Sequence, residues 1–301
     1  MDNPIRQKTI PAWLGCPVCQ GPLDQTETSL GCPADGLNFP LQDSIFRLLP
    51  PGEREAAGAY AEEYRQQREA QGWRPLTAEE LATLPQKAPA GWDPLYWPAR
   101  QQSFAALLAW LNTFDAPAGT PLRVVDMGAG FGWLAGRLAA GGREIVALDL
   151  SADDAFGLGA ARQTAADYDR PLLLAQGDIE RPPLQPGQID LLIFNASLHY
   201  AVDLKKCLRS AAQLLRSGGA LIIMDTPVLV GDFTALPPTE GQSLRRGRQL
   251  PLAELKQALT TAGLAFEIRQ PKRGWRWSIR QWRIRFFGGP GFTLPFIIAR
   301  H

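Results

Sequence analysis

The pattern of apolar and polar positions changes twice along the 301-residue chain. Residues 1–50 carry short strand-like pieces between closely spaced prolines, which exclude a long helix and predict a small β-ribbon. Residues 51–99 begin with a charged helix near Glu53–Gln71 and continue as an irregular aromatic stretch, a linker and candidate active-site lid. The remaining residues, 100–301, predict an α/β domain. The sequence therefore predicts three parts.

Buried strands alternate with helices in the third part. Its first helix has apolar residues at helical spacing, namely Phe104, Leu107, Leu108 and Leu111. Short apolar runs follow at Leu122–Val125, Ile145–Leu148, Leu172–Ala175, Ile189–Phe194 and Ala220–Met224. Helical stretches lie around Trp133–Ala140, Ala155–Tyr168 and Leu204–Leu215. Continuous apolar strands that alternate with helices are typical of a parallel sheet covered on both faces.

Composition and charge narrow the class of protein. A hydrophobic content of 45% with 20% charged residues is ordinary for a globular chain and excludes disorder as the main state. We find no apolar run long enough to span a membrane and no secretory signal, so we expect a cytoplasmic protein. The net charge of +1 conceals a division, because residues 269–301 hold eight basic and no acidic residues. The rest of the chain carries a net charge of −7.

A glycine-rich loop lies between the first strand and the next helix. It contains Gly128, Ala129, Gly130 and Gly132. Glycines allow a tight turn and a close approach to a ligand, and a helix N-terminus offers N–H groups. NAD enzymes also carry such a loop, so the loop alone leaves the ligand open.

Acidic residues after the first three strands favour a nucleoside ligand that carries an ammonium group. Asp149, followed by Leu150, ends the second strand, where a carboxylate can accept both ribose hydroxyls. Asp178 follows the third strand and can reach an adenine amino group, with Ile179 beside the ring. Asp126 precedes the glycine loop, where it would suit an α-ammonium group and repel a pyrophosphate.

These features resemble a class I S-adenosylmethionine-dependent methyltransferase over about residues 122–230. Val125–Gly132 resembles the first motif of that family, Asp190–Asn195 the fourth, and Leu215–Ala220 the turn before the fifth strand. The resemblance implies a Rossmann-like, seven-stranded, mostly parallel sheet with an antiparallel C-terminal strand near Leu294–Arg300. It also implies S-adenosylmethionine as cofactor, with these candidate contacts: Asp126, Gly128, Ala129, Gly130, Asp149, Leu150, Asp178, Ile179 and Asn195. An NAD-binding domain and a cofactor-binding regulatory module without turnover are the alternatives.

The segment after the fourth strand supplies the candidate catalytic residues. His199 is one of two histidines and the best candidate base, while Asn195 could position the acceptor or the cofactor. Alternatively, His199 packs at the start of the next helix and touches no substrate. Arg100 could pair with the methionine carboxylate, or it is a surface arginine beside packed aromatic residues. The acceptor is a small molecule or RNA.

The cysteines of the ribbon predict a metal site. Cys16 and Cys19 are followed by Cys32 and Asp35, and two such pairs joined by a β-loop suit tetrahedral zinc. The stretch Cys16–Leu49 resembles a family of short zinc-ribbon-like proteins, some of which activate methyltransferases. A metal-free ribbon is the alternative. Cys207 is expected to be buried and apolar.

A basic amphipathic helix is predicted within an insertion over residues 272–289. Apolar residues recur on one face, at Trp275, Ile279, Trp282 and Phe286. Arg276, Arg280 and Arg283 share that spacing on an adjacent face and mark a candidate site for an anionic partner. Three interpretations remain open: the tryptophan stripe docks on the sheet, or the helix holds RNA, or it lies on an anionic membrane surface.

Overall fold

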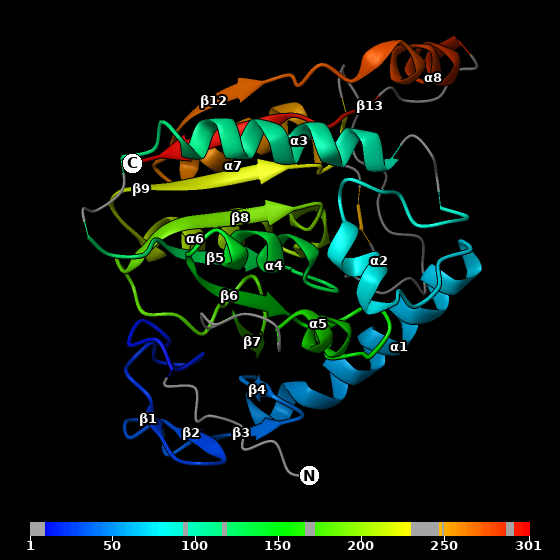
Figure 1. Ribbon diagram of the computed structural model, residues 1–301. Coiled ribbons are helices and arrows are strands. Elements are labelled where there is room, and N and C mark those ends of the chain that lie inside the picture. Colours follow the sequence, from blue (N-terminus) through cyan, green and yellow to red (C-terminus); the bar gives the residue numbers. More distant parts are fainter. Residues whose placement is uncertain are drawn as a thin grey trace.

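Figure 1 shows the computed structural model of the chain, which describes residues 10–92, 96–115, 119–165, 172–229, 247–248, 250–286 and 292–301. Its main feature is an eleven-stranded sheet in the order β1-β2-β3-β4-β7-β6-β5-β8-β9-β14-β12. Its central strands are β5 (Arg123–Met127), β6 (Glu144–Asp149), β7 (Leu172–Gln176), β8 (Ile189–Asn195), β9 (Leu215–Met224), β12 (Ala265–Arg269) and β14 (Phe296–Arg300).

The order of the central strands confirms the predicted seven-stranded methyltransferase sheet. Strands β7, β6, β5, β8 and β9 are parallel, and β14 is antiparallel to both β9 and β12. The predicted C-terminal strand is thus antiparallel, as expected. Strand β12 escaped the sequence analysis because it lies at the edge of the sheet, where its residues alternate between exposed and half-buried.

Helices cover both faces of this sheet (Figure 1). One face packs against α6 (Leu204–Leu214) and α7 (Leu252–Thr261), and the other against α3 (Tyr96–Leu111), α4 (Trp133–Ala140) and α5 (Leu158–Ala165). Neighbouring residues of one strand point to opposite faces of the sheet. Val125 packs in the hydrophobic core on the side of α6 and α7, and Val124 packs in the core on the side of α3, α4 and α5. The predicted helices are therefore present, and residues 166–168 of the second lie outside the described ranges. In α3, Leu108 is exposed while the other three predicted apolar residues are buried.

The ribbon extends the same sheet. It consists of β1 (Asp24–Gln25), β2 (Ser29–Gly31), β3 (Asn38–Gln42) and β4 (Ile45–Arg47). Strand β4 pairs in parallel with β7, with Ile45 opposite Leu174. The apolar residues Phe39 and Leu48 belong to the core of the α/β part. The ribbon is therefore joined to the larger unit by backbone pairing and by a shared core.

Three elements connect the ribbon to the α/β part: η1 (Pro51–Glu53), α1 (Arg54–Ala70) and α2 (Ala78–Thr83). Helix α1 reproduces the charged helix expected near Glu53–Gln71. An ion pair between Glu53 and Arg181 ties its beginning to the loop after β7. In Figure 1 the arrowheads of β8 and β9 point toward the side of the molecule on which α1 and α2 lie. The helices are thus placed at the carboxyl edge of the sheet.

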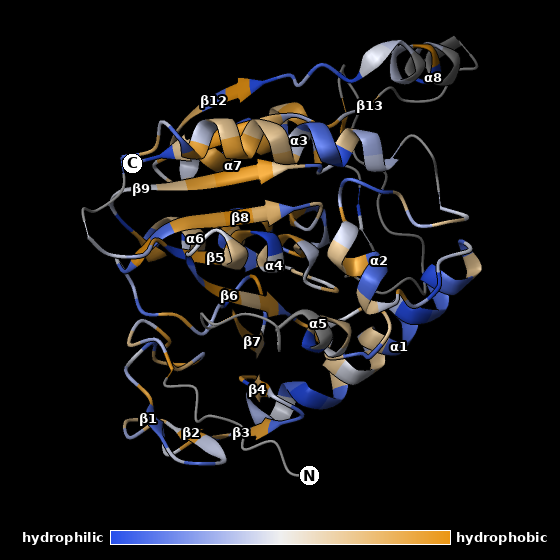
Figure 2. Ribbon diagram, in the orientation of Figure 1, coloured by the Kyte–Doolittle hydropathy of each residue, from blue (hydrophilic) through white to orange (hydrophobic). Residues whose placement is uncertain are grey.

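A small second sheet and an outlying helix complete the structure. The sheet has the order β11-β10-β13, formed by β11 (Leu250–Pro251), β10 (Val228–Leu229) and β13 (Phe292–Thr293). Helix α8 (Gly274–Phe286) realises the predicted amphipathic helix and stands at one end of the molecule, beyond β12 and β13 (Figure 1). Figure 2 shows that the central strands are strongly hydrophobic, whereas α1 is largely hydrophilic.

The interpretation in which the tryptophan stripe of α8 docks on the sheet is wrong. Trp275 and Trp282 are 69% and 62% exposed, and Ile279 is 48% exposed. Instead Trp277, about half a turn away on the helix, is buried beside Ala99 and Leu294. Trp275, Ile279 and Trp282 do share one face, and the side chain of Phe286 lies outside the described part of the structure. Among the described side chains of the helix, Trp277 on the opposite face is the one buried against the body.

Candidate cofactor cleft and zinc site

A cleft opens at the carboxyl ends of the parallel strands, where ligands bind in sheets of this kind. It encloses about 580 Å³, part of which is open to solvent. Its wall is formed by Tyr60, Tyr64, Gly128, Gly130, Asp149, Leu150, Ser151, Phe156, Ile179, Ala196, Ser197 and Tyr200. Five of the predicted cofactor residues, Gly128, Gly130, Asp149, Leu150 and Ile179, therefore line one cleft.

The glycine loop adopts a backbone that only glycine accepts without strain. Gly128, Gly130 and Gly132 all have positive φ, at 75°, 55° and 71°. A Cβ on Gly128 would lie 2.5 Å from Cβ of Ser197, which itself belongs to the cleft wall. The loop is thus packed directly against the segment that follows β8.

Amides of this loop are already bonded within the protein. Gly128 and Ala129 donate to the carbonyl of Leu148 at 2.8 and 2.9 Å. The Gly130 amide donates to Oδ2 of Asp149 at 2.7 Å, and Oδ1 of Asp149 accepts the amide of Ser151 at 2.8 Å. A pyrophosphate needs such amides as donors. Their use inside the protein disfavours a dinucleotide ligand.

Asp126 is the most unusual group at this edge. Its side chain is buried at 1% exposure, and neither carboxylate oxygen makes a hydrogen bond of normal geometry among the described residues, although the nearby backbone amide of Ala135 acts to lower its pKa. Burial, reinforced by the charge of Asp149, raises the pKa of Asp126 to about 7. A buried carboxylate without a partner is costly unless a cation or a proton neutralises it.

The other predicted cofactor residues lie around the same edge. Burial raises the pKa of Asp149 to about 6, although three backbone amides oppose that shift. Asp178 follows β7 and its Oδ1 accepts the amide of Glu180 at 2.9 Å, while Ile179 reaches the cleft wall. Asn195 ends β8, and its buried Oδ1 lacks a hydrogen-bond partner among the described residues.

Three tyrosines also line the cleft, and the part that they form is called its tyrosine end. This part adjoins the cofactor residues, because burial and the charge of Asp149 both contribute to the raised pKa of Tyr60. Tyr60 and Tyr64 of α1 stack at 5.9 Å between ring centroids, and Tyr64 meets the edge of Tyr200 from η2 (Leu198–Tyr200) at 5.9 Å. Arg68 donates to the Tyr200 hydroxyl at 2.7 Å and stacks on Tyr64 and Trp73, at 4.6 Å from each ring. Among the described residues, no carboxylate lies within ion-pair distance of Arg68.

Sequence reasoning missed this tyrosine end. The available signal was the spacing of Tyr60 and Tyr64, four residues apart in an otherwise charged helix, which places them on one face. It also missed Ser197 and Phe156, which line the cleft but carry no motif.

The candidate base His199 lies beside the cleft but not in its wall. Its ring packs on Tyr200 at 4.3 Å, and its Nδ1 is buried without a partner among the described residues. Burial, with smaller contributions from Arg68 and Arg100, lowers the pKa of His199 to about 3. The imidazole is therefore neutral at neutral pH and a weak base. Arg100 stacks on Tyr96 and Trp97, at 5.6 and 5.2 Å.

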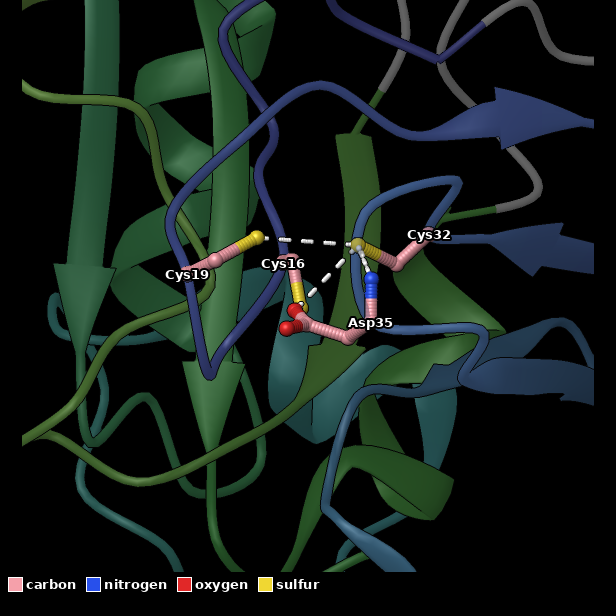
Figure 3. Close-up of side chains that lie close together, drawn as sticks. All are labelled: Cys16, Cys19, Cys32 and Asp35. Atoms are coloured by element: carbon pink, nitrogen blue, oxygen red, sulfur yellow. Dashed lines mark hydrogen bonds between the residues drawn. The ribbon is translucent and has the colours of Figure 1, made fainter.

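The four predicted metal ligands come together in the ribbon (Figure 3). The ligand atoms of Cys16, Cys19, Cys32 and Asp35 lie within 4.8 Å of one another. The sulfurs of Cys19 and Cys32 are 3.6 Å apart, and Oδ2 of Asp35 lies 3.1 and 3.3 Å from those of Cys16 and Cys32. Zinc–sulfur bonds of about 2.3 Å in a tetrahedron require sulfurs about 3.8 Å apart. The cluster has the size that zinc needs. Cys207 is buried on α6, as expected.

Comparisons with known proteins agree with both parts of this geometry. Residues 125–223 match the family model of the methyltransferase domain, and residues 13–44 match that of Trm112p-like proteins. The chain therefore contains a methyltransferase domain preceded by a Trm112p-like region, which confirms both resemblances.

Curated relatives match this chain over part of their length. A malonyl-[acyl-carrier protein] O-methyltransferase of Erwinia pyrifoliae is 32% identical over 162 residues, which are 52% of this chain and 59% of the relative. One of Enterobacter lignolyticus is 35% identical over 40% of this chain and 44% of the relative. The chain thus spans about half the length of these relatives.

Solved structures share the fold. The Burkholderia thailandensis 1,6-didemethyltoxoflavin-N1-methyltransferase, bound to S-adenosylhomocysteine, is 18% identical with a TM-score of 0.52, over 87% of this chain and 94% of that one. Phosphoethanolamine N-methyltransferase 2 of Haemonchus contortus, with S-adenosyl-L-methionine, is 16% identical with a TM-score of 0.51, over 74% and 57%.

Proposed function

We propose that the cleft binds S-adenosylmethionine and transfers its methyl group to an acceptor that enters at the tyrosine end. The observation that carries this proposal is the contrast between two sets of groups. The loop amides that a pyrophosphate would need are bonded to Leu148 and Asp149, whereas the buried carboxylate of Asp126 lacks a partner among the described residues. A ligand with an ammonium group and no phosphate suits both the bonded loop amides and the buried carboxylate.

Each residue of the cofactor end has a role in this proposal. Asp126 holds the α-ammonium group, directly or through water. Gly128 and Gly130 let the ligand approach the backbone, since side chains there would fill the cleft. Asp149, whose oxygens each have a second lone pair, accepts the ribose hydroxyls beside Leu150. Asp178 and Ile179 contact the adenine, and Asn195 contacts the methionine end.

The chemistry of methyl transfer is supplied by the cofactor when it is bound, because its sulfonium carries an electrophilic methyl group. What the chain adds is position: the tyrosines of α1 and η2 hold the acceptor in line with the methyl group. A general base is needed only if the nucleophile carries a proton. His199, with its pKa lowered to about 3, is poorly suited to remove one.

An acceptor that is already anionic suits this environment. Arg68 and Arg100 both lie close enough to His199 to lower its pKa, and we propose that these two cations create a positive field at the acceptor end. A carboxylate is attracted by this field and attacks without losing a proton. The named activity of the relatives, O-methylation of a malonyl group, agrees with a carboxylate.

The test uses S-adenosylmethionine labelled in the methyl group. The protein is incubated with three acceptors: a malonyl thioester, catechol and phosphoethanolamine. We expect label in the malonyl thioester, released as volatile methanol by mild alkali because the product is an ester. Label in catechol or phosphoethanolamine alone would refute the carboxylate acceptor but keep methyl transfer. Cofactor binding without transfer to these acceptors or to a cell extract would instead indicate the cofactor-binding regulatory module.

The ribbon cluster is proposed to hold one structural zinc ion, bound by Cys16, Cys19, Cys32 and Asp35. Its four ligands come from the protein, which closes the coordination sphere as in structural rather than catalytic sites. Thiolate ligands persist in a reducing compartment, which supports the expected cytoplasmic location. Elemental analysis should find about one zinc per chain in the wild type and in the control C207A. The variant C32S should lose it; full zinc content in C32S would refute the assignment.

Helix α8 is the proposed site of an anionic partner. Its three arginines, Arg276, Arg280 and Arg283, lie in the segment that has no acidic residue. The side chains of Arg276 and Arg283 lie outside the described part of the structure. Their place in the helix nevertheless puts all three on one flank. No described helix is long and apolar enough to cross a membrane.

A further inference from the structure

The outer face of α8 is the most exposed apolar feature of the described structure. Trp275, Ile279 and Trp282 follow one another at i, i+4 and i+7, and each is about half exposed or more. Elsewhere in the described residues, the large exposed apolar side chains are scattered singly, at Val18, Leu108 and Val202. Exposed apolar residues gathered on one helix face mark an interaction surface.

The opposite face fixes this helix to the body, so the stripe keeps its outward direction. Trp277 is buried, and its ring meets Phe292 edge-on at 5.7 Å. Just before the helix, Arg273 donates to the carbonyl of Leu294 at 2.6 Å and to the hydroxyl of Ser103 at 2.9 Å. It also lies 3.6 Å from the buried carboxylate of Asp225. The contacts of Trp277 and Arg273 therefore attach the helix to the body of the protein.

The charges of α8 flank the stripe on both sides. At 100° per residue, Arg276, Arg280 and Arg283 fall on one flank, and Arg285 falls on the other. No acidic residue occurs from 269 to 301, whereas the rest of the chain is net acidic. The partner of this surface must therefore be anionic and must accept an apolar ridge with a row of three arginines on one side and one arginine on the other.

We propose that α8 docks this protein on an anionic lipid surface, lying flat with Trp275, Ile279 and Trp282 in the headgroup region. Tryptophan prefers that region because its ring is apolar and its N–H is polar. The flanking arginines reach the phosphates of the headgroups. At 13 residues the helix is about 20 Å long, too short to span a bilayer.

A lipid surface accounts for the stripe better than RNA does. RNA-binding surfaces stack bases on aromatic rings, but an aliphatic residue in the middle of the stripe, Ile279, offers no ring. A bilayer accepts aliphatic and aromatic groups alike. This inference deepens the proposed anionic partner and does not depend on whether the cleft transfers methyl groups.

Flotation with vesicles tests this inference on the full chain. Wild-type protein should float with vesicles that contain phosphatidylglycerol, much less with pure phosphatidylcholine, and less at high salt. The double variant W275S/W282S and the variant R280E should each lower the binding constant at least about tenfold. The matched control V202S, at a similarly exposed apolar residue of another surface, should bind like the wild type.

Three results would overturn the proposal: equal flotation with neutral vesicles, unchanged flotation of W275S/W282S, or binding of poly(U) RNA without binding of anionic vesicles. S-adenosylmethionine binding is measured on the same preparations. Because none of the substituted residues belongs to the cleft wall, it should be unchanged in all variants. Loss of lipid binding can thus be distinguished from failure to bind S-adenosylmethionine.

Discussion

The carboxylate of Asp126 is costly to bury in the protein without ligand, and in the proposed complex it pairs with the ammonium group of the cofactor. With its pKa raised to about 7 by burial, it is largely protonated below that pH and must ionise to pair with an ammonium group. Affinity for S-adenosylmethionine should therefore be constant above about pH 7.5 and fall toward pH 5. Isothermal titration calorimetry at several pH values measures this, with proton release on binding near pH 6.

The variant D126N should bind the cofactor about tenfold more weakly at pH 8 and lose this pH dependence. D225N is the matched control, because Asp225 is equally buried but already accepts a hydrogen bond from Ser103 at 2.6 Å.

A raised folded-state pKa removes stability as pH rises, so ligand-free wild type should lose roughly 2–3 kcal/mol relative to D126N between pH 5 and pH 8. An unchanged difference in urea unfolding would contradict the assigned pKa.

Gly128 gives a second prediction for a single residue. A Cβ there would clash with Ser197 at 2.5 Å, on a backbone with φ of 75°. Gly142 has a similar φ of 81° but open space around it. Both alanine variants should lose about 1 kcal/mol of stability from backbone strain. G128A should lose more than G142A because of the clash with Ser197, and only G128A should also lose cofactor binding. Equal cofactor binding by the two variants would show that the loop does not touch the ligand.

Individual residues also show which parts of the candidate site could be predicted from the sequence. Gly128, Asp149 and Ile179 were identifiable because the loop, the strand ends and their order form a motif. The candidate metal ligands of the ribbon were identifiable because their spacing is local. Tyr60 and Tyr200 were not, since they come from segments 140 residues apart that meet only in the folded chain. The catalytic roles of His199 and Asn195 remain predictions.

Among the elements, α1 is the candidate lid of the cleft. Its tyrosines contribute to the wall, and the bond from Arg68 to Tyr200 ties the helix to η2. Replacing Tyr60 by alanine should open this side and raise the dissociation rate of S-adenosylhomocysteine by roughly threefold to tenfold. Stopped-flow displacement measures the rate. E62A, an exposed position of the same helix, should leave it unchanged; equal rates for Y60A and wild type would contradict a lid role.

Elements with strong periodicity were predictable and the others were not. The parallel strands read as continuous apolar runs because helices bury both of their faces, as for β8. Helix α8 was found from its stripe, but its orientation was not, because the deciding contact of Trp277 with Phe292 is tertiary. Local pattern showed that a helix is present here but not which of its faces is buried.

At the scale of the whole molecule, one sheet joins two regions that match different families. The β4–β7 pairing and the shared core predict that ribbon and methyltransferase domain unfold together. Removal of residues 1–50 should leave the edge of β7 unpaired and produce a protein that aggregates or melts at lower temperature. Differential scanning calorimetry of the full chain should give one transition. Two separated transitions would show that the ribbon is an independent unit.

The central claim is that the cleft is built for S-adenosylmethionine and not for a dinucleotide. Calorimetric titration of the purified chain with S-adenosylmethionine and, separately, with NAD tests it most directly. We predict one site with micromolar affinity for S-adenosylmethionine, weakened in D126N, and no binding of NAD. Binding of NAD without binding of S-adenosylmethionine would contradict the account.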